Sequence, residues 1–191
     1  MRVLLCSLLL VFAAGDSWWS THPTGSESNL RGLALVVHHS SVNVWATGSK
    51  GTVLHSVDGG NTWQAMHIAG AESLDFRGIQ TFDGKAIYVM SSGPGDASRI
   101  YKSEDGGGTW KVQYTDKRKP FFLDALACSD EKHCFALSDP VGGKFLLLAT
   151  SDGSTWKELP REHMPDALPQ DPWVGVFTSS VRRSLLLFSA W

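Results

Sequence analysis

The sequence has little of what a nucleic-acid-binding or membrane-spanning protein needs. Its 17 basic residues are balanced by 19 acidic ones, so there is no long run of either sign. The one short basic cluster, Lys117 to Lys119, is typical of a solvated turn. Nucleic-acid binding requires a basic face or stripe, and beyond the first residues no apolar run is long enough to span a bilayer. We therefore expect no nucleic-acid partner and no membrane span.

The N-terminus has the pattern of a secretory signal peptide. Arg2 precedes an apolar run from Val3 to Phe12, and small residues follow at positions 13–15. This order of charge, apolar run and cleavage site predicts that residues 1–15 are removed on export to the periplasm or the cell exterior. Residues 16–28 then form a lead-in strand or linker. The alternative is a buried first strand behind a misplaced start codon.

Cysteine is scarce, and its placement limits the chemistry. Cys6 lies in the predicted signal peptide, which leaves Cys128 and Cys134, six residues apart. An even pair in an exported protein is typical of a disulfide. A metal site would need more ligands than His133, the only other candidate nearby, and two free thiols are the remaining alternative. We therefore expect no metal. We also expect no cofactor, because the glycines at 106–108 belong to a turn and not to a phosphate-binding loop.

Three copies of one short motif dominate the rest of the chain. They occupy 56–63, 103–110 and 150–156, and their aspartates follow at intervals of 47 residues (58 to 105 and 105 to 152). In such a turn the carboxylate accepts hydrogen bonds from backbone N–H groups, and glycine supplies the positive φ. The predicted structural residues are Ser56, Asp58, Gly60, Thr62, Trp63, Ser103, Asp105, Gly107, Thr109, Trp110, Asp152, Gly153, Thr155 and Trp156. We expect Trp63 and Trp110 to be largely buried under their turns; a calcium loop would need more acidic positions.

The segments between the motifs align as well. Each repeat contains four short strand patterns separated by Gly, Asp and Ser clusters, with no helical period. Four strands at this period predict an all-β chain of propeller blades. The three blades cover about 29–70, 71–117 and 118–160. Residues 138–140, with sequence Ser-Asp-Pro, are expected to form a turn.

The C-terminal stretch departs from the repeat. Residues 161–191 contain no such motif and end on the apolar run from Leu185 to Trp191. We interpret them as the divergent or truncated start of a further blade. Three blades make an incomplete propeller, since propellers close with about four to eight. The chain is then a truncated or frame-shifted product, or half of a propeller completed by another chain, and an open apolar edge on the last blade would promote self-association.

The motif resembles the Asp-box, or BNR, repeat. Residues 29–160 are similar to that superfamily, which includes sialidases, sortilin-type receptors and the photosystem II assembly and stability factors. The stretches 122–126 and 136–145 are most similar to exported proteins of the photosystem-assembly-factor group. The resemblance implies a six- or seven-bladed propeller in a complete member. It also implies binding to a protein partner, which in photosynthetic members is an assembling membrane-protein complex.

Two arginines are the candidate binding residues. Arg31 and Arg77 stand at the same point of successive repeats, each followed by glycine, and Asp124 replaces the arginine in the third. If they line the central axis, they can bind an anion or an acidic peptide; the alternative is a purely structural role. Sialidases use three arginines, a tyrosine nucleophile with a glutamate, and an acidic acid/base, and no such set can be named here.

Three functions therefore remain open. The first is a non-catalytic scaffold that binds protein. The second is a fragment of a sialidase-type glycoside hydrolase whose active site lies partly outside this chain. The third is a cell-surface or matrix component without a discrete site. No catalytic residue is predicted, and the repeats favour the scaffold.

Overall fold

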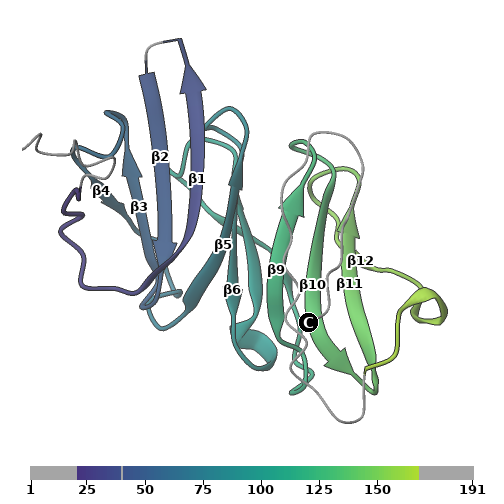
Figure 1. Ribbon diagram of the computed structural model, residues 1–191. Helices are drawn as coiled ribbons and strands as arrows, with labels where there is room; N and C mark the ends of the chain where they lie inside the picture. The colour runs from purple at the N-terminus through teal and green to yellow at the C-terminus, as the bar shows by residue number, and fades with distance from the viewer. Residues whose placement is uncertain (1–20, 40, 168–191) are drawn as a thin grey trace, which may run out of the picture.

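The structure is a computed structural model that describes residues 21–39 and 41–167. The predicted signal peptide and residues 168–191 lie outside the described residues. Within them the chain forms three four-stranded antiparallel sheets, arranged side by side in Figure 1. Two short 3-10 helices, η1 (Gly95–Ala97) and η2 (Arg161–His163), are the only helices described. The predicted all-β architecture is confirmed.

Each sheet is built from consecutive strands, so all connections are short. The first sheet contains β1 (Leu30–His38), β2 (Ser41–Gly48), β3 (Thr52–Ser56) and β4 (Gln64–Met66). The second contains β5 (Asp75–Thr81), β6 (Ile87–Ser92), β7 (Arg99–Ser103) and β8 (Lys111–Thr115). The third contains β9 (Leu123–Cys128), β10 (Cys134–Val141), β11 (Lys144–Thr150) and β12 (Lys157–Glu158). The turn expected at residues 138–140 is wrong, because these residues lie within β10, whose pairing with β11 is irregular between Ser138 and Val141.

The core lies between the sheets, and the second sheet is covered on both faces. Every residue of β6 is buried. Ile87 and Val89 pack into the cluster shared with the first sheet, whereas Tyr88 and Met90 pack into the cluster shared with the third. Successive side chains of a strand point to opposite faces. A strand covered on both faces therefore becomes a continuous apolar run, as it is here.

The repeated turns connect the third and fourth strands of each sheet. In the first, Asp58 Oδ1 accepts hydrogen bonds from Ser56 Oγ and the Thr62 N–H, both at 2.8 Å. Asp105 accepts the corresponding bonds at the same distances. In the third turn, one residue shorter, Asp152 Oδ1 accepts from the Thr155 N–H at 2.7 Å. Each aspartate therefore ties the two ends of its turn together.

The tryptophans that follow these turns differ in burial. Trp63 and Trp110 are half-buried, and each indole donates a hydrogen bond of 3.0 Å to a glycine carbonyl of its own turn. Trp156 is 7% exposed and packs edge-to-face on Tyr88, with ring centroids 6.3 Å apart. Trp63 and Trp110 are thus less buried than Trp156, the equivalent residue of the third repeat. Their rings bond to their own turns and remain partly open to solvent.

The turns predict a loss of stability in acid. Hydrogen bonds from Thr62 and Ser56 lower the pKa of Asp58 to about 2, and bonds from Thr109 and Ser103 lower that of Asp105 to about 2. Bonds from Thr155 and Ser154 also hold the pKa of Asp152 well below its usual range. An unfolded aspartate titrates near pH ~4. The stabilisation is therefore complete above about pH 4 and is lost as the pH falls through about 2.

Urea unfolding followed by tryptophan fluorescence at pH 7, 5, 4, 3 and 2 measures this effect. The midpoint should stay constant from pH 7 to 5 and fall steadily below about pH 4. Asp58→Asn is the control, because it removes one titrating carboxylate and should flatten the decline. A midpoint unchanged down to pH 2 would contradict the prediction.

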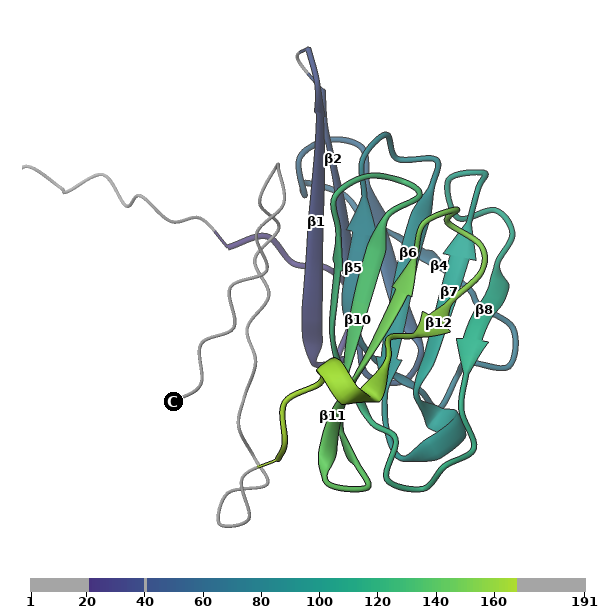
Figure 2. The same cartoon turned by 90° about the vertical axis from the view of Figure 1, so that its right-hand side faces the viewer.

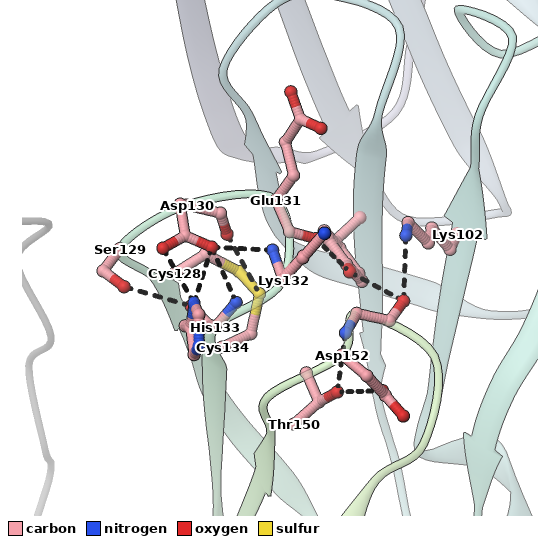
Figure 3. Close-up of a disulfide and its surroundings, with 12 residues drawn as sticks. Lys102, Cys128, Ser129, Asp130, Glu131, Lys132, His133, Cys134, Thr150 and Asp152 are labelled. Atoms are coloured by element: carbon pink, nitrogen blue, oxygen red, sulfur yellow. Dashed lines mark hydrogen bonds and ion pairs between the residues drawn. A yellow bond between two sulfur atoms is a disulfide. The ribbon is translucent and has the colours of Figure 1, made fainter.

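One hairpin of the third sheet is cross-linked and bound to the second sheet. Cys128 and Cys134, which are paired in register on β9 and β10, form a disulfide that closes the loop 129–133 (Figure 3). Within this loop the Glu131 carbonyl accepts a hydrogen bond of 2.8 Å from the Tyr88 hydroxyl. The loop is thereby held against the neighbouring sheet.

The same tyrosine also reaches the third repeated turn. The Gly153 carbonyl lies 2.9 Å from the Tyr88 hydroxyl and accepts a 2.9 Å hydrogen bond from Lys102 Nζ. Lys102 is buried and forms an ion pair of 3.2 Å with Glu104. We call the contact of Tyr88, Lys102, Glu131 and Gly153 the Gly153 junction. Through it, two side chains of the second sheet hold a loop and a turn of the third sheet in place.

The large exposed apolar side chains described lie mainly on β1, the strand at one side of the molecule in Figure 2. Leu33, Leu35 and Val37 alternate along it, each more than half exposed. On the third sheet, where the sequence led us to expect an apolar edge, the segment after η2 continues the pairing: the Phe145 N–H donates to the Pro165 carbonyl and the Ala167 N–H to the Gly143 carbonyl.

Candidate functional site

The candidate site is a cavity formed by the first strand of each sheet. It has a volume of about 350 Å³ and is lined by residues of β1, β5 and β9, which follow one another across Figure 1. Arg31, Arg77 and Asp124 are among the lining residues. The structure thus brings together the two predicted binding residues and the aspartate that replaces the third arginine.

A bulge in each first strand positions these three residues. On β1 the register shifts between Leu30 and Gly32, which leaves Arg31 unpaired. On β5 the shift between Phe76 and Gly78 leaves Arg77 unpaired. On β9, Leu123 pairs with Ser138 and Ala125 with Leu137, so Asp124 is unpaired in the same way. A bulge turns the extra residue out of the regular alternation, which explains why all three side chains line one cavity.

The glycine after each arginine has a packing reason. A Cβ on Gly32 would collide with the Thr47 side chain and lie 3.3 Å from Ile79 Cγ2 of the next sheet. A Cβ on Gly78 would lie 3.4 Å from Leu126 Cβ of the third sheet. Gly32 therefore leaves no room for a side chain, whereas a methyl group at Gly78 would make ordinary van der Waals contacts. Ala125 takes this place in the third sheet.

One carboxylate holds the two arginines beside each other. Arg31 Nε lies 3.1 Å from Asp75 Oδ1, and Arg77 Nε donates a hydrogen bond of 3.0 Å to Asp75 Oδ2. Both arginine side chains keep more than a third of their surface exposed. Both ion pairs are made through Nε. Arg77 also lies over the Phe122 ring, 5.4 Å from its centroid, a cation–π contact that fixes the guanidinium plane.

The third bulge brings two carboxyl groups together. Asp124 on β9 interacts with Asp139 on β10, and burial together with the charge and hydrogen bond of Asp139 raises the pKa of Asp124 to about 7; the nearby Arg77 opposes this rise. Asp124 still exposes part of its surface to the cavity. The neighbouring Asp139 charge therefore disfavours ionisation of the Asp124 carboxyl group, and a nearby cation would favour it.

The site thus has a positive part and a negative part. The positive part consists of Arg31 and Arg77, and the negative part of Asp124 and Asp139. Guanidinium groups recognise carboxylates through paired hydrogen bonds. None of the residues that line the described cavity is a nucleophile with a base beside it.

The other predicted residues lie outside this cavity. The repeated turns join the third and fourth strands of each sheet, whereas the cavity is formed by the first strands. The disulfide closes the far end of β9. Over residues 21–39 and 41–167, no group of three or more His, Cys, Asp and Glu is arranged to hold a metal ion.

Three contributors to the site were not predicted from the sequence. Asp75 stands two residues before Arg77, and this proximity was a signal that could have been used. Phe122 precedes Asp124 by two residues, but nothing in its local sequence indicates a contact with β5. Asp139 was assigned to a turn, because Asp-Pro usually marks one.

Two solved structures resemble the chain in fold. YCF48 bound to D1 peptide matches with a TM-score of 0.58 and 14% sequence identity, over 71% of this chain. YCF48 from Cyanidioschyzon merolae matches with a TM-score of 0.55 and 23% identity, over 73% of this chain. The chain has a β-propeller fold. The three sheets are therefore blades, and the fold expected from the repeat resemblance is confirmed.

The match covers only part of these proteins. The chain spans 41% of the length of the first structure and 42% of the second. No protein-family model matches the sequence, and no curated protein matches it either. At these identities the likeness concerns the propeller fold. As for membranes, none of the described residues belongs to a helix with the length and apolarity needed to cross one.

Proposed function

We propose that this propeller is an exported, non-catalytic scaffold that binds a protein partner at the cavity between its first strands. The observation that carries the proposal is the pair of bulged arginines, Arg31 and Arg77, held beside each other by Asp75 in that cavity. Export rests on the sequence pattern of residues 1–15, which lie outside the described residues.

The ligand group that suits this pair is a carboxylate. With Nε of each arginine engaged by Asp75, the terminal nitrogens can donate to the two oxygens of one carboxylate. In a protein partner we assign this group to the free C-terminal carboxylate. The structural neighbour that carries a bound D1 peptide supports a peptide as the kind of ligand.

The third blade favours a scaffold over a glycoside hydrolase of the sialidase type. The resemblance to sialidases would require a third arginine, and Asp124 occupies the corresponding bulge. A carboxyl group there repels the substrate carboxylate that three arginines would hold. The cavity therefore suits binding better than that reaction.

A peptide-pool experiment tests the proposal. An acetylated pool of random hexapeptides is synthesised with free carboxyl ends and, separately, with carboxamide ends, and is passed over the immobilised protein. Retention is quantified by mass spectrometry. We expect the free-acid pool to be retained about tenfold more than the amide pool, the advantage of a hydrogen-bonded charge pair. Arg77→Ala should remove this difference.

Lys157→Ala is the matched control. Lys157 is exposed on the last strand of the third blade and does not line the cavity. Its loss changes the net charge as Arg77→Ala does, so retention should stay as in the native protein. Equal retention of the two pools by the native protein would overturn the proposal.

A further inference from the structure

The cavity holds a cationic group as well as a carboxylate. On β1 and β5 the bulge carries arginine, and on β9 the same bulge carries Asp124. The register fixes this equivalence, because the residue after each bulge pairs with the same position of the second strand: Gly32 with Thr47, Gly78 with Met90 and Ala125 with Leu137. The charge around the cavity therefore reverses at the third blade.

The arginines have a local partner, whereas Asp124 has none of opposite charge in ion-pair contact. Asp75 neutralises part of the charge of Arg31 and Arg77. Asp124 is instead placed against a second carboxyl group, Asp139. Among the described residues, no lysine, arginine or histidine forms an ion pair with either of these two aspartates. Asp124 lines the cavity, and its carboxyl group, beside that of Asp139, gains from a cation supplied by a ligand.

The shared cavity limits the ligand. Arg77 acts on Asp124 electrostatically, and both residues line the same cavity of about 350 Å³. A cation and a carboxylate that bind there together must therefore come from neighbouring positions of one small ligand segment. An ordinary peptide end provides this when a lysine or arginine stands close to the C-terminal carboxylate.

We propose that Asp124, with Asp139, is a specificity-determining site for a basic side chain next to the carboxylate held by Arg31 and Arg77. The inference rests on the function proposed above and narrows its ligand to peptide ends of mixed charge. Asp124 and Asp139 attract the basic group, and they repel a second acidic residue at that place. A purely acidic peptide is thus a poorer ligand than its charge alone would suggest.

The retained peptides of the random free-acid pool test this assignment directly. In the native protein at pH 8, lysine and arginine within the last three positions should be enriched about fivefold over the input pool, as expected for a partly exposed charge pair. Asp124→Asn keeps the shape and removes the charge, so the enrichment should fall to about one. Asp124→Arg should reverse it and favour acidic residues.

The dependence on pH gives a second readout. The groups that face the Asp124 carboxyl are Asp139 on β10 and Arg77 on β5. A bound cation favours the ionised Asp124 carboxylate, so the enrichment should be strong at pH 8, above the raised pKa of Asp124 of about 7, and weak at pH 6. In Asp124→Asn it should not change between these two values. Glu162→Gln, an exposed acidic residue on η2, is the control and should behave as the native protein.

The possible failures are distinguishable. Retention of the free-acid pool with no enrichment of lysine or arginine at pH 8 would overturn the role of Asp124 and leave the carboxylate site intact. An enrichment that persists in Asp124→Asn would overturn it too. No preference for the free-acid pool over the amide pool would overturn the proposed function, and the assignment of Asp124 with it.

Discussion

Gly153→Ala is expected to destabilise the protein by about 3 kcal/mol. Gly153 has a φ of +71°, where alanine is strained. An added Cβ would also lie 2.6 Å from the Glu131 carbonyl oxygen and 2.8 Å from the Tyr88 hydroxyl. These are the groups of the Gly153 junction, so the methyl group must break the contact that joins the second and third blades.

Gly143→Ala separates the two causes. Gly143 has a similar φ of +80°, but no atom lies within 4 Å of an added Cβ. This variant should carry only the cost of the left-handed backbone, about 1–2 kcal/mol. Urea unfolding of both variants and the native protein measures the difference. Equal losses would mean that the junction contributes nothing beyond the conformation of its glycine.

Trp156→Ala is expected to cost about 3–5 kcal/mol, the usual range for a buried tryptophan. Its ring fills the cluster between the second and third blades and packs on Tyr88. Trp63→Ala should cost about half as much, because this ring is half-buried although its indole is hydrogen-bonded. The order is informative, since the two residues occupy the same place in their repeats.

Thermal and urea unfolding of both variants test this order. Val57→Ala is a control in the first turn, because Val57 is 62% exposed and its truncation should change stability by less than about 0.5 kcal/mol. If Trp63→Ala costs as much as Trp156→Ala, the exposure of the tryptophan ring does not determine how much that ring contributes to stability.

The strands could be predicted because each lies between recognisable turns. The spacing of Asp58, Asp105 and Asp152 set the period, and alternating or continuous apolar residues marked the strands within it. The same alignment of the repeats places Arg31, Arg77 and Asp124 at one position. The repeats supplied this information because equivalent positions of equivalent sheets face the same way.

Contacts between blades could not be predicted in the same way. Trp156 packs on Tyr88 of the neighbouring blade, whereas Trp63, at the same place of its own repeat, is less buried. Asp139 was assigned to a turn because Pro140 follows it. In the structure both residues lie in β10, whose irregular pairing accommodates the proline. Ion pairs such as those of Asp75 depend on how a bulge directs a side chain, and the bulge leaves no clear mark in the sequence.

At each bulge, the residue that lines the cavity and the small residue that follows it have different roles. This division of roles has a consequence for how the sequence can evolve. The small residue packs against the neighbouring strands, most tightly at Gly32, whereas the residue before it lines the cavity. Substitution at the bulge can therefore alter the charge of the cavity while the blades stay packed. Asp124 in the third blade, at the position that holds arginine in the first two, is compatible with this independence of charge and packing.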